Sequence, residues 1–249
     1  MLDVPTGLTF SRVSRLSTEA EELWHRAEAI ASRDPASPAA RDVLQRLVRL
    51  LPERGEAYVF AHRKLGEALA LEDPWTASLH LRKVVAETPE DDGAWGLLGL
   101  AQSLLGHHRF AVRSYEEALT RAPHNPWYAH NLGHLYDVVF DDLDRALPLL
   151  ERAVQGITHF EGGAGPIARL AAQGRDEVVA SYAHALMRRG HLVEARRWMR
   201  DLVRSGASPD HHALYDHIVA GQDRVLSRLM QQGEAPPRRP IRKRRHTSV

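Results

Sequence analysis

Histidine is the residue type in this chain with the clearest capacity for chemistry, since fifteen of the 249 residues are histidines. His130 and His134 are four residues apart, so on a helix both imidazoles would lie on one face, a spacing that suits a bound zinc ion. His212 and Asp216 have the same spacing. Neither pair has a third ligand or a catalytic base nearby in the sequence, and the zinc-protease pattern HExxH does not occur. We therefore predict no metal site and no cofactor.

Other catalytic patterns give no better candidate. Cysteine is absent, so no thiolate can act as a nucleophile or as a metal ligand. Residues Gly163 to Ala168 read GAGPIA, a loose likeness to the dinucleotide-binding fingerprint, which needs a preceding strand that the sequence does not offer. The sequence contains no P-loop, no G-x-S-x-G and no carboxylate pair with a partner base. The expectation is a protein that is not an enzyme.

Charge and hydropathy indicate a water-soluble chain. Lys and Arg number 33 against 32 Asp and Glu. The first residues have no basic segment followed by an apolar core, so no signal peptide is expected. No run of about 18 apolar residues occurs, so no membrane span is expected either. These features, with the lack of cysteine, predict a cytoplasmic location.

The stretch from Asp92 to Asn125 carries residues that suit two closely packed helices. Gly99 and Ala111 are small enough to let two antiparallel helices approach each other. Pro123 has no backbone N–H to donate, so it would end the second helix. The space between the two helices would be filled by larger apolar residues, namely Trp95, Leu98, Tyr115 and Ala118.

The same residue types return in phase on both sides of that stretch. Trp24 and Tyr58 take the place of the tryptophan in the two preceding units, and Leu132-Gly133 repeats the Leu-Gly step in the following unit. No segment alternates with a period of two, so about eleven helices and no sheet are expected. The predicted organisation is a flexible N-terminus at 1–18, repeats at about 21–54, 55–91, 92–125, 126–156 and 176–209, a loop insertion at 157–175, a capping helix at 210–231 and a disordered basic tail at 232–249.

Over residues 19–231 this pattern resembles the tetratricopeptide repeat family, whose units read W-x2-L-G…A-x3-F…P. Here tyrosine stands for phenylalanine, and Gln102 stands where tyrosine is usual. The resemblance implies an all-α, right-handed solenoid of helical hairpins closed by a C-terminal capping helix. An unrelated helical bundle is the alternative, and chance seldom keeps aromatic, alanine and proline residues in phase over several units.

The resemblance also implies a concave groove lined by the first helix of each hairpin. Such a groove binds an extended peptide or a partner helix. In this chain its middle would be small and apolar, at Gly96 and Leu100, with indole, imidazole and guanidinium groups around it. The residues predicted to bind a partner are Trp127, His130, Asn131, His134, Asp137, Arg63, Leu100, His184 and Arg188.

One subclass of the family grips the C-terminal carboxylate of heat-shock chaperones with a set of lysine, asparagine and arginine residues. Asn131 occupies one of the matching positions in this chain. The preceding repeat has Gly96 and Leu100 where the clamp needs lysine and asparagine, and the following repeat has Glu177 and Ser181 where it needs lysine and arginine. A chaperone-tail adaptor is therefore not expected.

The C-terminal segment is strongly basic and rich in proline, so it is expected to be disordered. A block of positive charge attracts nucleic acid, anionic lipid or an acidic protein surface. The residues predicted to contact a polyanion are Arg238, Arg239, Arg242, Lys243, Arg244 and Arg245.

Three functions remain open from the sequence. The first is a non-catalytic adaptor or scaffold that binds a protein partner in its groove. The second is a regulatory protein whose basic tail contacts nucleic acid or another polyanion. The third, an enzyme accessory with a histidine-bound metal, has the least support, because neither histidine pair has a third ligand.

Overall fold

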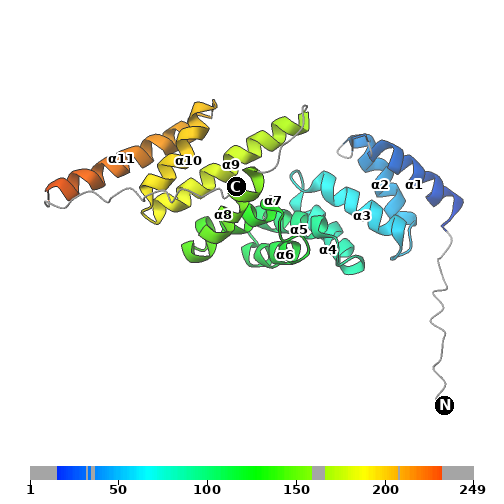
Figure 1. Ribbon diagram of the computed structural model, residues 1–249. Coiled ribbons are helices and arrows are strands. Elements are labelled where there is room, and N and C mark those ends of the chain that lie inside the picture. The colour runs from blue at the N-terminus through cyan, green and yellow to red at the C-terminus, as the bar shows by residue number, and fades with distance from the viewer. Residues whose placement is uncertain (1–15, 32, 35–36, 159–165, 207, 232–249) are drawn as a thin grey trace, which may run out of the picture. The chain divides into compact units, whose positions relative to one another are not determined.

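A computed structural model describes residues 16–31, 33–34, 37–158, 166–206 and 208–231 (Figure 1). Every regular element in these ranges is a helix, which confirms the all-α prediction. The elements are α1 (Thr18–Ala31), α2 (Pro38–Leu50), α3 (Glu56–Leu69), α4 (Pro74–Glu87), α5 (Asp92–Leu104), α6 (His108–Arg121), α7 (Pro126–His134), the π-helical turn η1 (Leu135–Val139), α8 (Leu143–Thr158), α9 (Pro166–Arg188), α10 (Leu192–Arg204) and α11 (Pro209–Gln231).

Short polar side chains determine where several helices begin. Asp73 accepts a hydrogen bond from the Thr76 N–H at 3.1 Å, and Asp91 accepts one from the Ala94 N–H at 2.8 Å. Ser37 and Asn125 cap α2 and α7 in the same way. Each bond satisfies a backbone donor that the first turn of a helix leaves without a partner. Proline follows the cap in α2, α4 and α7, where its missing N–H costs nothing.

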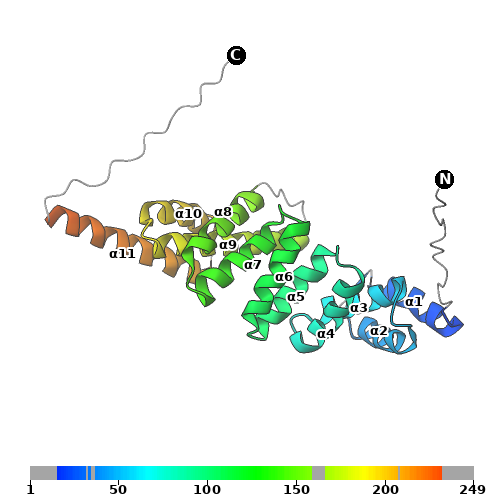
Figure 2. The ribbon, with the colours of Figure 1, turned by 90° about the horizontal axis from the view of Figure 1, so that it is seen from below.

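The chain divides into two compact units, residues 1–141 and residues 142–249. In the first unit α1 packs on α2, α3 on α4 and α5 on α6, and each hairpin also packs on the next one. Figure 2 shows α5 and α6 side by side, as the contacts between them require. The first helices of successive hairpins also touch, α1 with α3 and α3 with α5. This is the tandem stacking of helical hairpins that the repeats predict.

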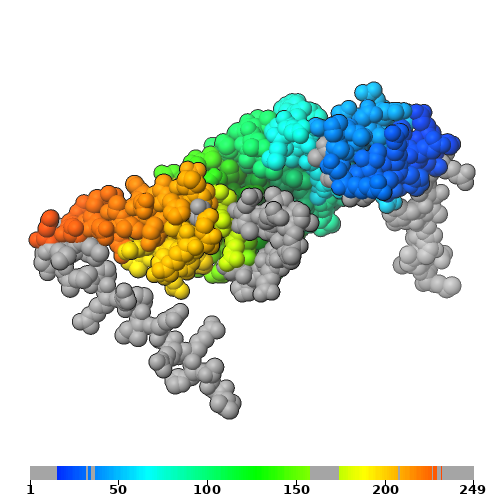
Figure 3. Space-filling view, turned by 90° about the horizontal axis from the view of Figure 1, so that it is seen from above, coloured from blue at the N-terminus to red at the C-terminus, as the bar shows by residue number. Residues whose placement is uncertain are grey.

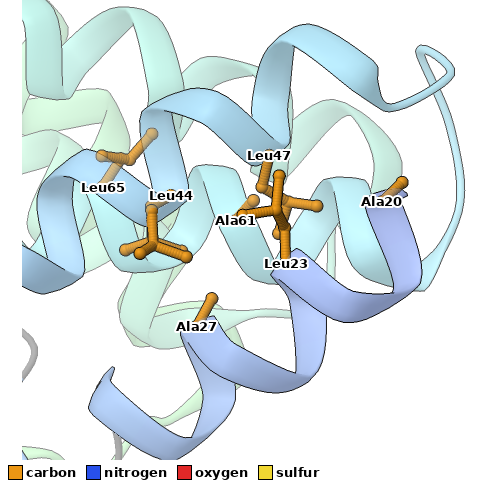
Figure 4. Packing of buried hydrophobic residues seen from close by; sticks show 8 residues of the cluster. Ala20, Leu23, Ala27, Leu44, Leu47, Ala61 and Leu65 are labelled. Atoms are coloured by element: carbon orange, nitrogen blue, oxygen red, sulfur yellow. The ribbon is translucent and has the colours of Figure 1, made fainter. Parts of the chain in front are cut away.

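Leucine and alanine form the core of the first unit. Leu23 of α1, Leu44 of α2 and Leu65 of α3 meet in a cluster that joins the first two hairpins (Figure 4). In the third hairpin Tyr115 is buried against Gly99, where an added Cβ atom would lie 2.9 Å from the tyrosine ring. Such a distance is shorter than any ordinary carbon contact, so this helix crossing requires glycine.

The second hairpin has a histidine at the position where the repeat pattern places a small residue. His62 of α3 is fully buried, and its Nδ1 lies 2.6 Å from Nδ1 of His80 on α4. The ring of Tyr58 meets His62 edge to face at a centroid distance of 4.3 Å. An imidazole pair, with His62 buried and His80 partly buried, therefore joins the two helices of this hairpin.

The second unit consists of α8 to α11, and each helix packs on the next. Arg189 pairs with Asp144 at 2.7 Å, which connects the end of α9 to the start of α8. The last helix, α11, packs on α10 and also contacts α9. In Figure 3 the yellow to amber atoms of α10 adjoin the orange atoms of α11.

The prediction of a loop over 157–175 differs from the structure. Helix α8 continues to Thr158, and α9 begins at Pro166. The reason is local: proline suits the first turn of a helix, and the following residues IARLAAQ are mostly good helix formers. Only residues 159–165 separate the two helices, and they lie outside the described residues.

Candidate functional site

The residues predicted to bind a partner lie on α3, α5, α7, η1 and α9, and so in both compact units. In the first unit Arg63 lies on α3 and Leu100 on α5, and both are partly exposed. Trp127, His130 and Asn131 of α7 are also partly exposed, and His134 is exposed. His184, which is partly exposed, and Arg188, which is exposed, lie on α9 of the second unit.

Asp137 does not belong to an exposed groove surface. Its exposed fraction is only 2%. The α-helix that starts at Pro126 changes at Leu135 into the π-helical turn η1, which is wider than an α-helical turn. Asp137 lies within this turn and is buried, so it presents almost no surface to a partner.

His130 and His134 form a small imidazole cluster on α7. Their ring centroids are 6.0 Å apart, and Nδ1 of His130 lies 3.3 Å from Oδ1 of Asn131. Burial and then the nearby His134 lower the pKa of His130 to about 4. At neutral pH His130 is therefore uncharged, and it presents an aromatic, hydrogen-bonding surface rather than a positive charge.

Asn131 has a second role in the core. It lies near the hydroxyl of Tyr115, as Ser103 does. Burial raises the pKa of Tyr115 to about 12, so this hydroxyl stays protonated. Asn131 thus connects the exposed part of α7 to the core of the preceding hairpin.

Tyr128 covers the part of the groove that the sequence analysis expected to be open. Its hydroxyl donates a hydrogen bond to Asp92 Oδ2 at 2.8 Å, and its ring lies over Gly96. Burial and then the Asp92 carboxylate raise the pKa of Tyr128. The floor of this face is therefore a tyrosine that bridges α7 and α5, and not a bare glycine.

Arg63 is held by carboxylates of its own chain. Its Nε donates to Asp91 Oδ2 at 2.9 Å, and another guanidinium nitrogen donates to Glu67 at 2.6 Å. Lys64 also donates to Glu67, at 2.8 Å. Arg63 connects α3 to the start of α5, and its charge is already balanced. A carboxylate on a partner would have to compete with these two bonds.

Replacing Gly96 with alanine tests whether Tyr128 forms this floor. The new Cβ would lie 2.4 Å from a ring carbon of Tyr128, so the ring must move. We expect a loss of about 1–3 kcal/mol in the free energy of unfolding, measured by urea denaturation. In a Tyr128→Ala background the same change should cost much less, because the clashing ring is gone. An equal cost in both backgrounds would contradict the placement of Tyr128 over Gly96.

Sequence reasoning missed Tyr128, Asp92 and the buried pair His62 and His80. The histidine pair left a signal, because His62 interrupts the small-residue position of its repeat. The contact of Tyr128 with Gly96 joins two repeats and leaves no pattern within either one. Among the described residues, no three His, Asp or Glu side chains come close enough to hold a metal ion.

Two further features of the chain bear on its partners. Within the described ranges no helix combines the length and the apolar character needed to cross a membrane. The basic residues predicted to contact a polyanion all lie outside the described residues, and these are Arg238, Arg239, Arg242, Lys243, Arg244 and Arg245.

Comparison with known proteins gives the fold. No family model and no curated protein matches the sequence. Among solved structures, MamA residues 41 to the end from Desulfovibrio magneticus RS-1 is similar with a TM-score of 0.60 and 17% identity, over 78% of this chain and 100% of that one. Pseudomonas aeruginosa PilF is similar with a TM-score of 0.59 and 17% identity, over 86% of this chain and 90% of that one.

A third similar structure is the APC/C hetero-tetramer Cut9–Hcn1. Its TM-score is 0.59 at 13% identity, over 82% of this chain and 40% of that one. All three are tetratricopeptide-repeat proteins. Together with the stacked hairpins, these similarities show that the chain has the tetratricopeptide-repeat fold.

Proposed function

We propose that this protein is a non-catalytic adaptor that binds a peptide or a helix of a partner protein. The binding face would be the exposed side of α3, α5 and α7 in the first unit. The observation that carries this proposal is the cluster of Trp127, His130 and His134, which is partly exposed on α7, the helix that packs on α6. Aromatic side chains that are only partly buried by their own fold are the usual anchors of protein interfaces.

The charges on this face favour a partner without a strong negative charge. Arg63 is balanced by Asp91 and Glu67, and Asp92 already accepts the hydroxyl of Tyr128. His130 is neutral because of its burial. Affinity would therefore come from aromatic and apolar contacts, with hydrogen bonds from imidazole and amide groups. Such an interface responds weakly to salt, since few ion pairs form.

The similar structures support a scaffold role only in a general way. One of them is a subunit assembly, the Cut9–Hcn1 hetero-tetramer. We infer that this chain also works through contacts with other proteins, and that His184 and Arg188 offer a separate contact point on the second unit. Their lower priority reflects their place on α9, in the other unit.

The triple substitution Trp127→Ala, His130→Ala and His134→Ala tests the binding face. We expect the variant to fold and to lose the bound partner in affinity purification from the native cells, followed by mass spectrometry. The matched control replaces three exposed residues of α10, Glu194, Arg197 and Asp201, with alanine. The control should keep the partner.

Two outcomes would contradict the proposal. One is a partner that both variants retain, which would place the interface elsewhere. The other is a triple variant that unfolds like a core mutant, because Trp127, His130 and His134 would then serve the fold. A circular dichroism melt of each purified variant separates these outcomes from a true loss of binding.

A further inference from the structure

A second apolar surface lies on the second helix of a hairpin, away from the face proposed above. Leu71, Trp75 and Leu79 are 75%, 56% and 44% exposed. Leu71 follows the end of α3, and Trp75 and Leu79 lie four residues apart on one face of α4. Arg82 continues the same face one turn later and is also exposed. We call these four residues the α4 patch.

The repeat itself does not require apolar residues at these positions. Counting from the buried alanine of each second helix, Trp75 and Leu79 correspond to Pro38 and Asp42 in the first hairpin. In the third hairpin the corresponding residues are Arg109 and Arg113. The fold therefore accepts proline, acidic or basic residues there. The fold therefore does not need a large exposed indole beside a leucine at this place. Contact with a partner would explain why they are there.

The third hairpin carries positive charge at the equivalent positions of the next repeat. Arg109 and Arg113 of α6 correspond to Trp75 and Leu79 of α4, and both are exposed. Helices α4 and α6 both pack on α5 in the same unit, so these positions belong to neighbouring repeats of one stack. Phe110, which is also exposed, lies next to Arg109. The described residues give neither arginine an ion pair.

Acidic groups near the α4 patch are already engaged. Glu72 pairs with Arg41 of α2, and Asp73 accepts the hydrogen bond that caps α4. Lys83, one residue beyond Arg82, is exposed and lies over the ring of Tyr58 at 5.9 Å. The free charge around the patch is therefore positive.

From this arrangement we propose that the α4 patch, with Arg109 and Arg113, binds an amphipathic helix that carries acidic residues beside its apolar face. Trp75 would be the central anchor, since tryptophan and arginine dominate the energetics of interfaces. The guanidinium groups would bind carboxylates of the partner through two parallel hydrogen bonds. This surface lies on second helices, so it is separate from the proposed binding face on α3, α5 and α7, and both could be occupied at once.

The probe for this proposal is a synthetic amphipathic helix of about 18 residues, with leucine on one face and glutamate beside it. A second peptide replaces glutamate with lysine, and a third scrambles the order of the first. Binding of fluorescein-labelled peptides to the full-length protein is followed by anisotropy. We expect the acidic helix to bind, with at least tenfold weaker binding of the lysine and scrambled peptides.

Variants locate the bound peptide. Trp75→Ser with Leu79→Ser should weaken binding of the acidic helix about tenfold or more. Arg109→Glu with Arg113→Glu should weaken it as well and should strengthen binding of the lysine peptide. The control Trp127→Ala with His134→Ala lies on the other face and should leave this binding unchanged. If the Trp127→Ala, His134→Ala variant loses the partner of the face on α3, α5 and α7, that result tests the proposed adaptor function. It does not test the α4 patch.

Other results would overturn the proposal. Equal binding of the acidic and scrambled peptides would show no recognition, and so would equal binding to the wild type and the Trp75→Ser, Leu79→Ser variant. Self-association of the wild type in sedimentation experiments, lost in that variant, would mean that a second copy of the chain covers the patch. Binding to anionic vesicles without binding to the acidic helix would assign the patch to a lipid surface.

Discussion

Replacing Tyr115 with alanine should lower the free energy of unfolding by about 3–5 kcal/mol. The side chain is 1% exposed and lies between α5 and α6, where its ring fills the space over Gly99. Its hydroxyl lies near Ser103 and Asn131. The substitution would leave a cavity that the surrounding side chains cannot fill completely. Urea denaturation followed by circular dichroism measures the loss.

Phe110→Ala is the matched control for this prediction. Phe110 is an aromatic residue of the same helix, α6, but it is exposed. Its replacement should change the free energy of unfolding by no more than about 0.5 kcal/mol, because the surface it leaves was already in contact with water. A Tyr115→Ala variant as stable as the Phe110→Ala variant would mean that the hairpin does not pack as the repeat pattern predicts.

The fold could be predicted because burial repeats along the chain. Leu98, Ala111 and Ala118 take their positions from contacts within one hairpin, and all three are buried. A contact that recurs at a fixed spacing leaves the same residue types at the same spacing. The tetratricopeptide-repeat fold follows from these residues, and the similar structures confirm it.

The candidate site could be predicted only in part, because its details do not repeat. The predicted α-helical register places His130, His134 and Asp137 on one face, but the π-helical turn η1 moves Asp137 into the interior. Tyr128 lies over Gly96 because two different repeats bring these residues together. The sequence pattern of a single repeat does not predict a contact between two repeats. That the residues on the exposed side of α7 bind a partner remains a prediction, which the binding experiment tests.

The contact between buried His62 and partly buried His80 also departs from the repeat pattern, and it makes stability depend on pH. Burial lowers the pKa of His62 to about 3, and repulsion from His80 and Lys83 acts in the same direction. Burial and then Lys83 also lower the pKa of His80. Both rings are therefore neutral at pH 7, and one Nδ1–H can donate to the other Nδ1 across 2.6 Å.

Protonation of this pair should favour the unfolded chain. An unfolded histidine takes up a proton near pH 6.5, whereas folded His62 stays neutral down to a pKa of about 3. The contribution of neutral His62 to the free energy of unfolding is therefore complete above pH 6.5. It is lost as the pH falls from 6.5 towards 3. For His62 alone the slope approaches about 1.4 kcal/mol per pH unit within that window.

His62→Leu should make this pH dependence less steep. Leucine has a similar size and cannot take up a proton, so the slope of stability against pH between pH 6 and pH 4.5 should fall by about 1.4 kcal/mol per pH unit. Urea denaturation of wild type and variant at several pH values measures both slopes. Carboxylates titrate in both proteins, so their effect cancels when the two slopes are subtracted. The remaining difference reports the protonation of His62. Measurements at pH 8 show how well the fold accepts leucine before any protonation occurs. If the two slopes are equal, His62 is protonated as readily in the folded protein as in the unfolded chain, and the buried neutral pair does not exist.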